Sequence, residues 1–290
     1  MTSYDHVSTI AVLGATGRQG GAVARKLLEG GWHVRALTRS PASRAARGLA
    51  AAGAEVMAVE MADSDSLDAA FAGAHGVYSV QNPVLSGVEA EVQHGRNVAD
   101  AARRTGVQHV VYGSAGTGTP GTGVGSWESK LQIEAHMRAL GLPLTVLRPM
   151  AFMELMTEKR FYPQASVWHL MPKLMGESRP VGWLSVDDLA VIAEKAFADP
   201  DAFVGRDIPL ASDVQTIGQC RELWRQAKGR APRRFPMPVW LFERFAGTDE
   251  TTMWKWLREN DVDLDTTPTL EIHPGACTVV QWLARRKRPT

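Results

Sequence analysis

The feature that most constrains this chain is a run of twenty residues, 9–28, in which an apolar stretch leads through spaced glycines into an amphipathic stretch. The β-rich part is Ile10–Leu13 and the helical part is Gln19–Glu29. The glycines between and within them are Gly14, Gly17 and Gly20. A tight turn favours a residue free to take positive φ, and a helix packed against a strand favours one without a side chain. The run therefore predicts a strand, a tight turn and a closely packed helix.

The same alternation continues through the first 150 residues, which predicts repeated βαβ units. Further β-rich stretches are Trp32–Leu37, Glu55–Val59, Gly76–Val80, Val107–Tyr112 and Leu144–Leu147. The helical stretches between them are Ala42–Ala52, Ser66–Phe71, Glu89–Arg104 and Trp127–Leu140. The predicted class is α/β, a Rossmann doubly wound parallel sheet with helices on both faces.

The rhythm breaks after Arg148. Residues 151–183 are rich in Met and aromatic residues, which suit either an irregular apolar pocket or packing against the C-terminal part. A helix is predicted at Val186–Ala198, prolines interrupt a helical region at 214–260, and a last helix is predicted at Thr278–Ala284. We expect 1–150 to form the Rossmann domain, with 184–212 returning to its sheet. Residues 151–183 and 213–290 would form a smaller, mainly helical substrate-binding or partner-binding part.

Composition excludes several classes of protein. The net charge is +1, from 32 basic and 31 acidic residues, which predicts no nucleic-acid or membrane partner. No signal-peptide pattern starts the chain, and no apolar run reaches the roughly 20 residues that span a bilayer. Two cysteines and eight scattered histidines form no metal-ligand spacing, and each histidine is expected in a loop or at the surface. We expect a cytoplasmic protein without a metal; a homodimer is a base-rate expectation.

The glycine turn predicts a dinucleotide site. A helix start carries unpaired N–H groups and the positive end of the helix dipole, which together hold a pyrophosphate. Thr16 adds a hydroxyl donor. The next strand ends in Thr38, Arg39 and Ser40 instead of the acidic residue that usually binds the ribose 2′-hydroxyl of NAD. A guanidinium binds a 2′-phosphate well, so the sequence predicts binding of NADP(H) in preference to NAD(H). The alternative is that Arg39 is a solvated loop residue that contacts no cofactor.

The ends of the next two strands complete the predicted site. Met61 would cover the adenine, and Asp63 would cap the helix that follows. Val80 and Gln81 would line the pyrophosphate or the nicotinamide ribose at the carboxyl edge of the sheet.

A set of motifs in a fixed order resembles the NmrA-like family of atypical short-chain dehydrogenases over residues 8–215. These are ValLeuGlyAlaThrGlyArgGlnGlyGly, ThrArgSerPro, ValValTyrGlySerAla, GluSerLys, LeuArgProMetAlaPheMetGlu and SerValAspAspLeuAla. The family includes NADP(H) sensors and quinone-reducing enzymes. By position, the resemblance implies phosphate contacts from the glycine loop, including Arg18 and Gln19. It also implies Arg39 at the 2′-phosphate, Lys130 at the nicotinamide ribose, and Pro149 to Phe152 beside the nicotinamide. Leu155 stands where the family commonly has Asn.

The catalytic constellation is incomplete. Reducing members of the superfamily use a Tyr four residues before the Lys; here Ser126 precedes Lys130. Ser114 stands where a substrate-orienting Ser would lie, and Tyr112 is expected to be a buried strand residue. Lys130 is the candidate catalytic residue; its alternative role is a surface pair with Glu134.

Three functions are compatible with the sequence. The first is an NAD(P)H-dependent oxidoreductase that reduces a quinone or another hydrophobic aromatic acceptor without a catalytic Tyr. The second is a non-catalytic NADPH/NADP⁺ sensor that regulates a protein partner. The third is a reductase in which Lys130 transfers the proton.

Overall fold

The structure is a computed structural model that describes residues 8–157 and 166–285. The chain divides into two compact units. The first contains residues 1–118, 129–148 and 189–208, and the second contains 119–128, 149–188 and 209–290. None of the helices in the described residues has the length and apolar character needed to cross a bilayer.

The first unit is built on a seven-stranded sheet of order β3-β2-β1-β4-β5-β6-β9. Its strands are β1 (Thr9–Val12), β2 (His33–Thr38), β3 (Glu55–Ala58), β4 (Gly76–Ser79), β5 (His109–Gly113), β6 (Leu144–Pro149) and β9 (Asp207–Leu210). The pairs from β3 through β6 are all parallel. The strand order reverses at β1, because β2 and β3 lie on one side of it and β4 on the other. The predicted α/β class and parallel sheet are confirmed.

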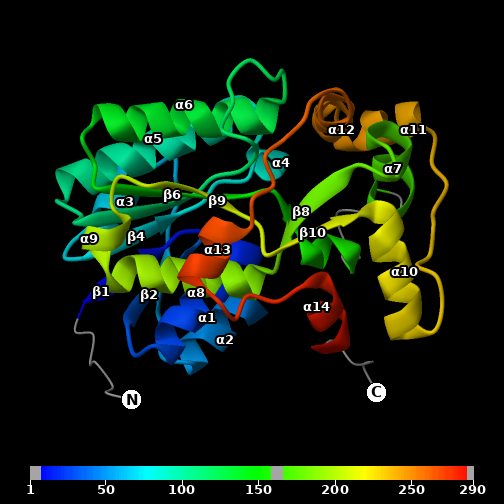
Figure 1. Cartoon of the computed structure of the whole chain (residues 1–290). Coiled ribbons are helices and arrows are strands. Elements are labelled where there is room, and N and C mark those ends of the chain that lie inside the picture. The colour runs from blue at the N-terminus through cyan, green and yellow to red at the C-terminus, as the bar shows by residue number, and fades with distance from the viewer. Residues whose placement is uncertain (1–7, 158–165, 286–290) are drawn as a thin grey trace. The chain divides into compact units, whose positions relative to one another are not determined.

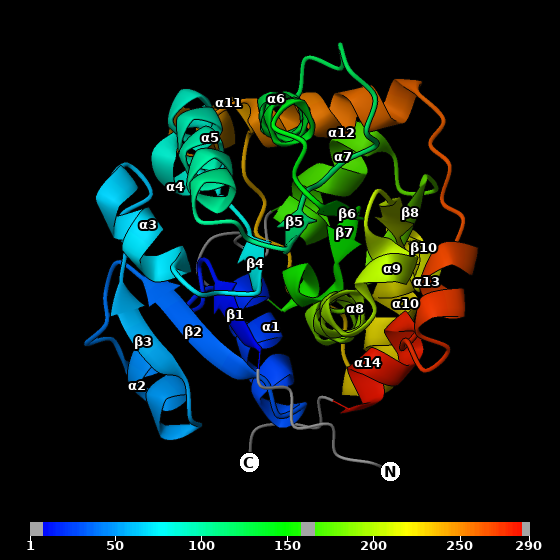
Figure 2. The ribbon, with the colours of Figure 1, turned by 90° about the vertical axis from the view of Figure 1, so that its left-hand side faces the viewer.

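Helices cover both faces of this sheet, with α3, α5 and α6 on one face and α1, α2 and α8 on the other (Figures 1 and 2). The helices are α1 (Arg18–Glu29), α2 (Arg44–Ala51), α3 (Ser64–Phe71), α4 (Pro83–Ser86), α5 (Val88–Arg104), α6 (Gly125–Ala139), α8 (Val186–Ala198) and α9 (Pro200–Phe203). Buried aliphatic and aromatic side chains of the sheet, α3, α5 and α6 form one core. Asp63 caps α3 as predicted, accepting a hydrogen bond from the backbone N–H of Asp65 at 3.1 Å.

The expectation that every histidine lies in a loop or at the surface is wrong for His109. This residue is fully buried in β5, and its Nε2 lies 2.8 Å from the Thr145 hydroxyl. Burial, together with the nearby His75, lowers the pKa of His109 to about 4. The neutral imidazole thus behaves as a core residue.

The second unit has its own small sheet, of order β10-β8-β7. The strands are β7 (Ala151–Phe152), β8 (Pro180–Leu184) and β10 (Asp213–Thr216). Its helices are η1 (Met153–Met156), η2 (Ser166–Leu170), α7 (Met171–Met175), α10 (Ile217–Lys228), α11 (Val239–Ala246), α12 (Asp249–Glu259), α13 (Thr267–Ile272) and α14 (Val279–Arg285). A Met-rich and Trp-rich core joins most of them. Polar bonds reinforce it: the buried Glu154 carboxylate accepts from Trp282 Nε1 and from the Val186 N–H.

Candidate functional site

The glycine turn follows β1 at the point where the strand order reverses. The N–H of Leu13 donates to the carbonyl of Tyr78 on β4 at 3.0 Å, and the N–H of Ala15 donates to the carbonyl of Leu37 on β2 at 3.2 Å. The turn is therefore bonded to both neighbouring strands. In open α/β sheets, the connections diverge at such a point and leave a crevice at the carboxyl ends of the strands.

Two of the three glycines are required by the backbone itself. Gly14 has φ of 61°, a conformation that side chains strain. A Cβ placed on Gly20 would lie 2.5 Å from the carbonyl oxygens of both Leu13 and Gly14. Gly17 is the N-cap of α1, and no side chain caps this helix start. The first turn of α1 consequently presents backbone N–H groups that an anion can bind.

The polar residues around this turn are connected to the end of β2. The hydroxyls of Thr16 and Thr38 lie 3.1 Å apart, and the Thr38 hydroxyl also accepts from the N–H of Ser40 at 3.1 Å. Arg39 lies between Thr38 and Ser40 in the sequence. Its side chain is exposed and forms no ion pair with another described residue. The structure thus leaves the Arg39 guanidinium available close to the glycine turn.

Gln19, in the first turn of α1, reaches the ends of the central strands. Its Oε1 accepts a hydrogen bond from the Tyr78 hydroxyl at 3.3 Å. A Cβ on Gly113 of β5 would lie 2.9 Å from that hydroxyl and 3.1 Å from Gln19 Oε1. Tyr78 is fully buried, which raises the pKa of its phenol. Sequence reasoning missed Tyr78, because its partners become neighbours only in the sheet.

The ends of β3 and β4 also meet at this edge of the sheet. Val80 packs beside the turn, since a Cβ on Gly14 would lie 3.5 Å from Val80 Cγ1. The Gln81 amide donates to the Ser79 hydroxyl at 3.0 Å and lies 4.0 Å from the sulfur of Met61. Gln81 Oε1 is buried and has no partner among the described residues. The predicted residues Gly14, Thr16, Gln19, Met61, Val80 and Gln81 are thus brought together.

Lys130 joins this group through Gln81 and a carboxylate that sequence reasoning missed. Its ammonium donates to the backbone oxygen of Gln81 at 2.8 Å and to Glu91 Oε1 at 2.6 Å. Glu91 also accepts from the Ser129 hydroxyl at 2.5 Å. Burial lowers the pKa of Lys130, while the Glu91 carboxylate opposes that shift. The surface pair of Lys130 with Glu134 is therefore wrong: Lys130 is buried and bonded to Glu91.

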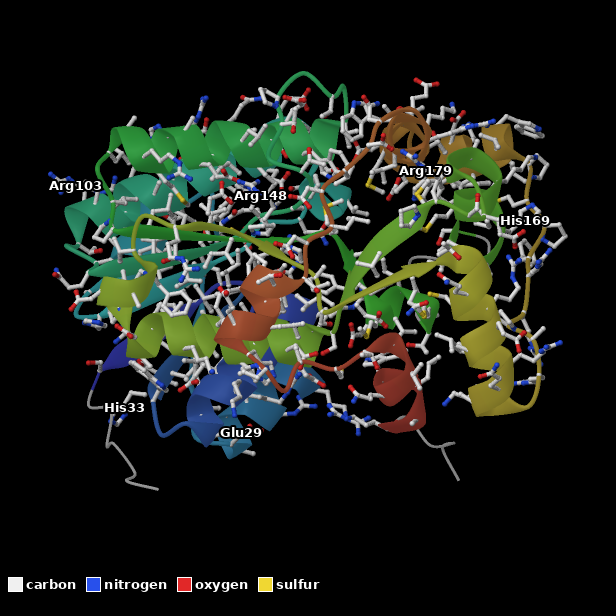
Figure 3. All side chains as sticks on the ribbon, in the orientation of Figure 1. Glu29, His33, Arg103, Arg148, His169 and Arg179 are labelled. Carbon is white, nitrogen blue, oxygen red and sulfur yellow. The ribbon has the colours of Figure 1, made fainter. Side chains whose placement is uncertain are left out.

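Glu134 belongs to a second buried network, around Arg148 (labelled in Figure 3). The guanidinium donates to both carboxylate oxygens of Glu134, at 3.0 and 2.8 Å, and to Asp207 on β9. Burial alone would lower the pKa of Arg148, but the two carboxylates together raise it. The Ser114 hydroxyl lies within this network, donating to Glu134 at 2.5 Å and accepting from Arg148 at 3.0 Å. The structure thus places Ser114 in a charged cluster that connects β5, β6, β9 and α6.

The described residues provide no accessible phenol. Tyr112 is fully buried in β5, as predicted, and its pKa is raised well above normal, mainly by burial. Its hydroxyl has no partner among the described residues, and Lys130 Nζ lies 5.8 Å from the ring centroid. At the position where the superfamily has its Tyr, Ser126 donates its backbone N–H to Asp249 at 3.1 Å.

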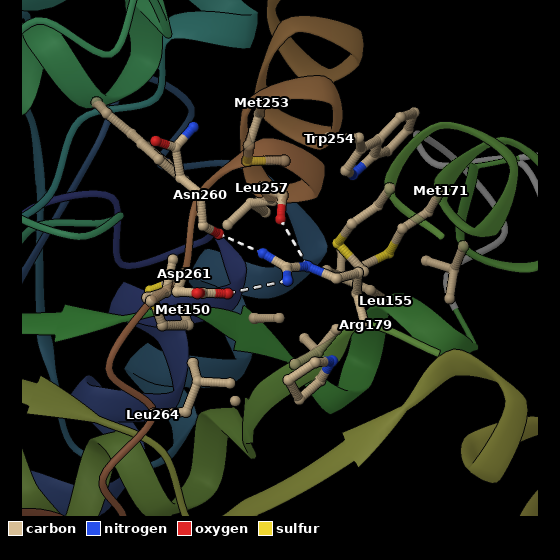
Figure 4. A pocket seen from close by; sticks show the side chains of 18 residues that line it. Met150, Leu155, Met171, Arg179, Met253, Trp254, Leu257, Asn260, Asp261 and Leu264 are labelled. Atoms are coloured by element: carbon tan, nitrogen blue, oxygen red, sulfur yellow. Dashed lines mark hydrogen bonds and ion pairs between the residues drawn. The ribbon is translucent and has the colours of Figure 1, made fainter. Parts of the chain in front are cut away.

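The Met-rich segment contributes to a pocket within the second unit. The pocket is lined mainly by apolar side chains, and its empty space is about 850 Å³ including the part open to solvent. Figure 4 shows Met150, Leu155, Met171, Met253, Trp254, Leu257 and Leu264 around it. Pro149, the last residue of β6, precedes the lining residues Met150 and Ala151, and Phe152 follows them in β7. Phe161, one of the aromatic residues in the Met-rich and aromatic-rich segment 151–183, lies outside the described residues.

Among the described residues that line the pocket, one guanidinium is present and it is already engaged. Arg179 Nε donates to the backbone oxygen of Leu257 at 3.0 Å, and its Nη2 donates to that of Asn260. Its Nη1 pairs with Asp261 at 3.0 Å (Figure 4). Arg179 therefore binds the C-terminal carbonyls of α12, and the described walls of the pocket favour an uncharged, apolar ligand.

Comparison with known proteins agrees with this architecture. A family model described as "NmrA-like family" matches residues 6–273. The NmrA-like oxidoreductase FrzB of Cladobotryum sp is 31% identical over 258 residues, which are 80% of this chain and 77% of that protein. The NmrA-like oxidoreductase hkm9 of Aspergillus hancockii is 32% identical over 260 residues, or 81% and 77% of the two chains.

Two solved structures show the same fold at lower sequence identity. The negative transcriptional regulator NmrA in complex with NADP has a TM-score of 0.75 and 22% identity, covering 97% of this chain and 95% of that one. Triphenylmethane reductase of Citrobacter sp., complexed with NADP(H), has a TM-score of 0.75 and 17% identity, covering 96% and 99%. With its Rossmann sheet, its glycine turn and a family match across most of its length, this chain belongs to the NmrA-like family.

Proposed function

We propose that the chain binds NADP(H) at the carboxyl edge of the first unit's sheet and acts as an NAD(P)H-dependent oxidoreductase. The observation that carries this proposal is the glycine turn. The α1 start has no side-chain cap, and Gly20 allows it to pack against the backbone of Leu13 and Gly14. An uncapped helix start at the reversal point of a parallel sheet is suited to a pyrophosphate. The NADP-bound and NADP(H)-bound neighbours support the same cofactor class.

Each of the predicted site residues would contact a particular part of the cofactor. Backbone N–H groups of Gly17 to Gly20, with Thr16, would hold the phosphates, and Arg39 would bind the 2′-phosphate through charge-assisted hydrogen bonds. Met61 would cover the adenine, and Val80 and Gln81 would line the crevice. Lys130 would hold the nicotinamide ribose. Ser114, Pro149 and Phe152 remain candidates for the nicotinamide end, and Arg18 for the phosphates.

Lys130 is proposed to bind and to keep its proton. Its ammonium already has two acceptors, Glu91 and the Gln81 carbonyl, which hold it in one position. The cofactor would supply the hydride, and an easily reduced acceptor such as a quinone could take its proton from water. This assignment fits a chain in which neither described Tyr is accessible.

The pocket of the second unit is the proposed site of the acceptor. Met, Leu and Val side chains line it, and the guanidinium of Arg179, the one found among its described lining residues, is bonded to backbone oxygens and to Asp261. Flexible thioethers adapt to flat rings of different shapes. The proposed substrate is therefore an uncharged aromatic molecule, such as a quinone.

Turnover with a panel of quinones and aromatic carbonyls tests this proposal, with NADPH consumption followed by absorbance. Met253→Trp should fill the pocket and lower kcat/KM at least tenfold without changing NADPH affinity, because a bulky ring displaces the acceptor. Lys255→Trp is the matched control, since Lys255 is on the same helix but does not line the pocket. Equal loss in both variants would show that the acceptor does not bind in this pocket.

A Lys130→Met variant tests the role of Lys130. A variant that keeps kcat while NADPH binding weakens would support the binding role, whereas loss of kcat alone would support proton transfer.

A cofactor-ratio sensor is the second candidate, and the burial of both described tyrosines favours it. A sensor would bind NADPH and NADP⁺ yet reduce none of the acceptors. NADPH binding without turnover of any acceptor in the panel would contradict the oxidoreductase and support the sensor.

A further inference from the structure

A strongly basic, aromatic surface lies in the second unit. It comprises residues 228–246, which are the end of α10, the loop that follows and α11 (Figure 1). These residues include five basic side chains and one acidic one, a net charge of +4. Because the whole chain carries only +1, the remaining residues must carry −3. This segment, which we call the basic aromatic surface, is therefore much more positive than the chain as a whole.

Little neutralises these positive charges. Arg230, Arg233, Arg234 and Arg244 form no ion pair with another described residue. The single acid, Glu243, is shared by the Thr251 hydroxyl at 2.6 Å and by Lys255 at 3.6 Å. The pKa of Arg221 is lowered by burial and, in addition, by the charge of Arg234. The surface thus presents uncompensated guanidinium groups.

The same surface exposes large aromatic side chains. Phe235, Trp240 and Phe245 are 57%, 69% and 78% exposed. On α11, the buried Phe242 occupies the inner face, and helical periodicity places Trp240 and Arg244 on the opposite side, while Phe245 is exposed near the end of the helix. Aromatic rings that project into water next to guanidinium groups mark an interaction surface. The partner must accept both apolar rings and positive charge.

We propose that the basic aromatic surface binds an anionic lipid membrane, lying at the interface without spanning it. Basic side chains contact anionic headgroups, while Trp and Phe enter the boundary with the acyl chains. A second copy of the chain would bring two surfaces of +4 together, and their repulsion opposes it. The whole-chain charge of +1 predicts no membrane partner, but it does not reflect how the charge is distributed along the chain.

The membrane contact would give the pocket access to lipid-soluble molecules. The Phe242 ring on the inner face of α11 lies 5.8 Å from the ring of Trp254, and Trp254 lines the pocket. The surface and the pocket wall thus belong to one packed pair of helices, α11 and α12. Supply of a lipid-soluble acceptor rests on the proposed function; the membrane contact itself does not.

Co-sedimentation of the full-length protein with vesicles tests the contact without any cofactor. We expect binding to phosphatidylcholine vesicles that contain phosphatidylglycerol, weaker binding at high salt, and little binding to pure phosphatidylcholine. Arg233→Gln with Arg234→Gln should lower the partition coefficient roughly 25-fold, because each basic residue near such a surface contributes about fivefold. Trp240→Ala with Phe245→Ala should also lower it at least tenfold.

Matched controls use exposed side chains outside the surface. Arg96→Gln with Arg103→Gln removes the same charge from α5, and Leu270→Ala with Val280→Ala removes exposed apolar side chains from α13 and α14. Both controls should bind vesicles like the wild type, and circular dichroism should show all variants folded. Failure of the folded wild type to sediment with anionic vesicles would overturn the proposal. So would equal binding to pure phosphatidylcholine, equal losses in the controls, or binding to an oligonucleotide in place of vesicles.

Discussion

The ammonium of Lys130 and the carboxylate of Glu91 lie 2.6 Å apart, and both side chains are almost completely shielded from solvent. Removing one partner of such a pair leaves a buried charge without compensation, which costs far more than the pair contributes. Glu91 therefore positions Lys130 and holds its ammonium against the Gln81 carbonyl. Lys130 would lose both its proton and its fixed position more readily without Glu91.

Glu91→Gln should lower the free energy of unfolding by about 3–5 kcal/mol at neutral pH. Glu91→Gln combined with Lys130→Met should recover at least half of that loss, because no buried charge remains. The Glu91→Gln loss should also shrink as the pH rises toward 10, since a deprotonated amine needs no counter-charge. Urea unfolding of the three variants measures these effects. A loss below about 1 kcal/mol in Glu91→Gln, unchanged in the double variant, would show that the pair is not coupled.

The residues that hold the glycine turn could be predicted from the sequence, whereas the partners of Lys130 could not. Gly14, Gly17 and Gly20 follow from local spacing. Glu91 lies 39 residues from Lys130 and becomes its neighbour only when α5 and α6 lie on the same face of the sheet. A helix-spaced Glu134 was available as a local partner, but Arg148 binds it instead.

At the scale of elements, the contact between β1 and α1 carries the candidate site. Gly20→Ala would place a Cβ 2.5 Å from two backbone oxygens, so α1 must move away from β1. We expect a loss of about 1–3 kcal/mol in stability and at least a tenfold loss in NADPH affinity. The measurements are urea unfolding and a binding titration.

Gly48→Ala provides the control on another helix. Gly48 is exposed in α2, and nothing lies within 4 Å of a Cβ added there. Alanine should stabilise that helix by about 0.4–1 kcal/mol and leave NADPH affinity unchanged. Equal NADPH affinity in Gly20→Ala and wild type would contradict the role given to the α1 start.

The strongly periodic elements of the first 150 residues were predictable, and the short ones were not. Strands β1 to β6 are apolar runs bounded by turn residues, so their positions follow from the sequence within a few residues. Strand β10 is half-buried and polar, and β7 has only two residues. Neither carries an apolar pattern of its own, because the pairing with β8 defines both. The composition of 151–183 predicts either an apolar pocket or packing against the C-terminal part, and the structure confirms that this segment lines a pocket.

For the whole molecule, His109 predicts a dependence of stability on pH. Its pKa is about 4 in the folded protein and near 6.5 when solvated. The unfolded chain therefore binds more protons between these values, so stability falls as the pH decreases through them. The difference between these two pKa values of His109 corresponds to a loss of roughly 3 kcal/mol in the free energy of unfolding. His109→Gln should be less stable at pH 7 but should lack this part of the slope, as urea unfolding from pH 7 to pH 4 would show. An unchanged slope in His109→Gln would assign the pH dependence to other groups.

The central claim, that the glycine turn and Arg39 bind NADP(H), is tested most directly by calorimetric titration of NADPH and NADH into wild type and Arg39→Ala. We predict saturable one-to-one binding of NADPH to the wild type. We also predict a loss of about tenfold or more in NADPH affinity for Arg39→Ala, with little change for NADH, because only the 2′-phosphate uses the guanidinium. Absence of any heat of binding for NADPH and NADP⁺ with the folded wild type would contradict the account.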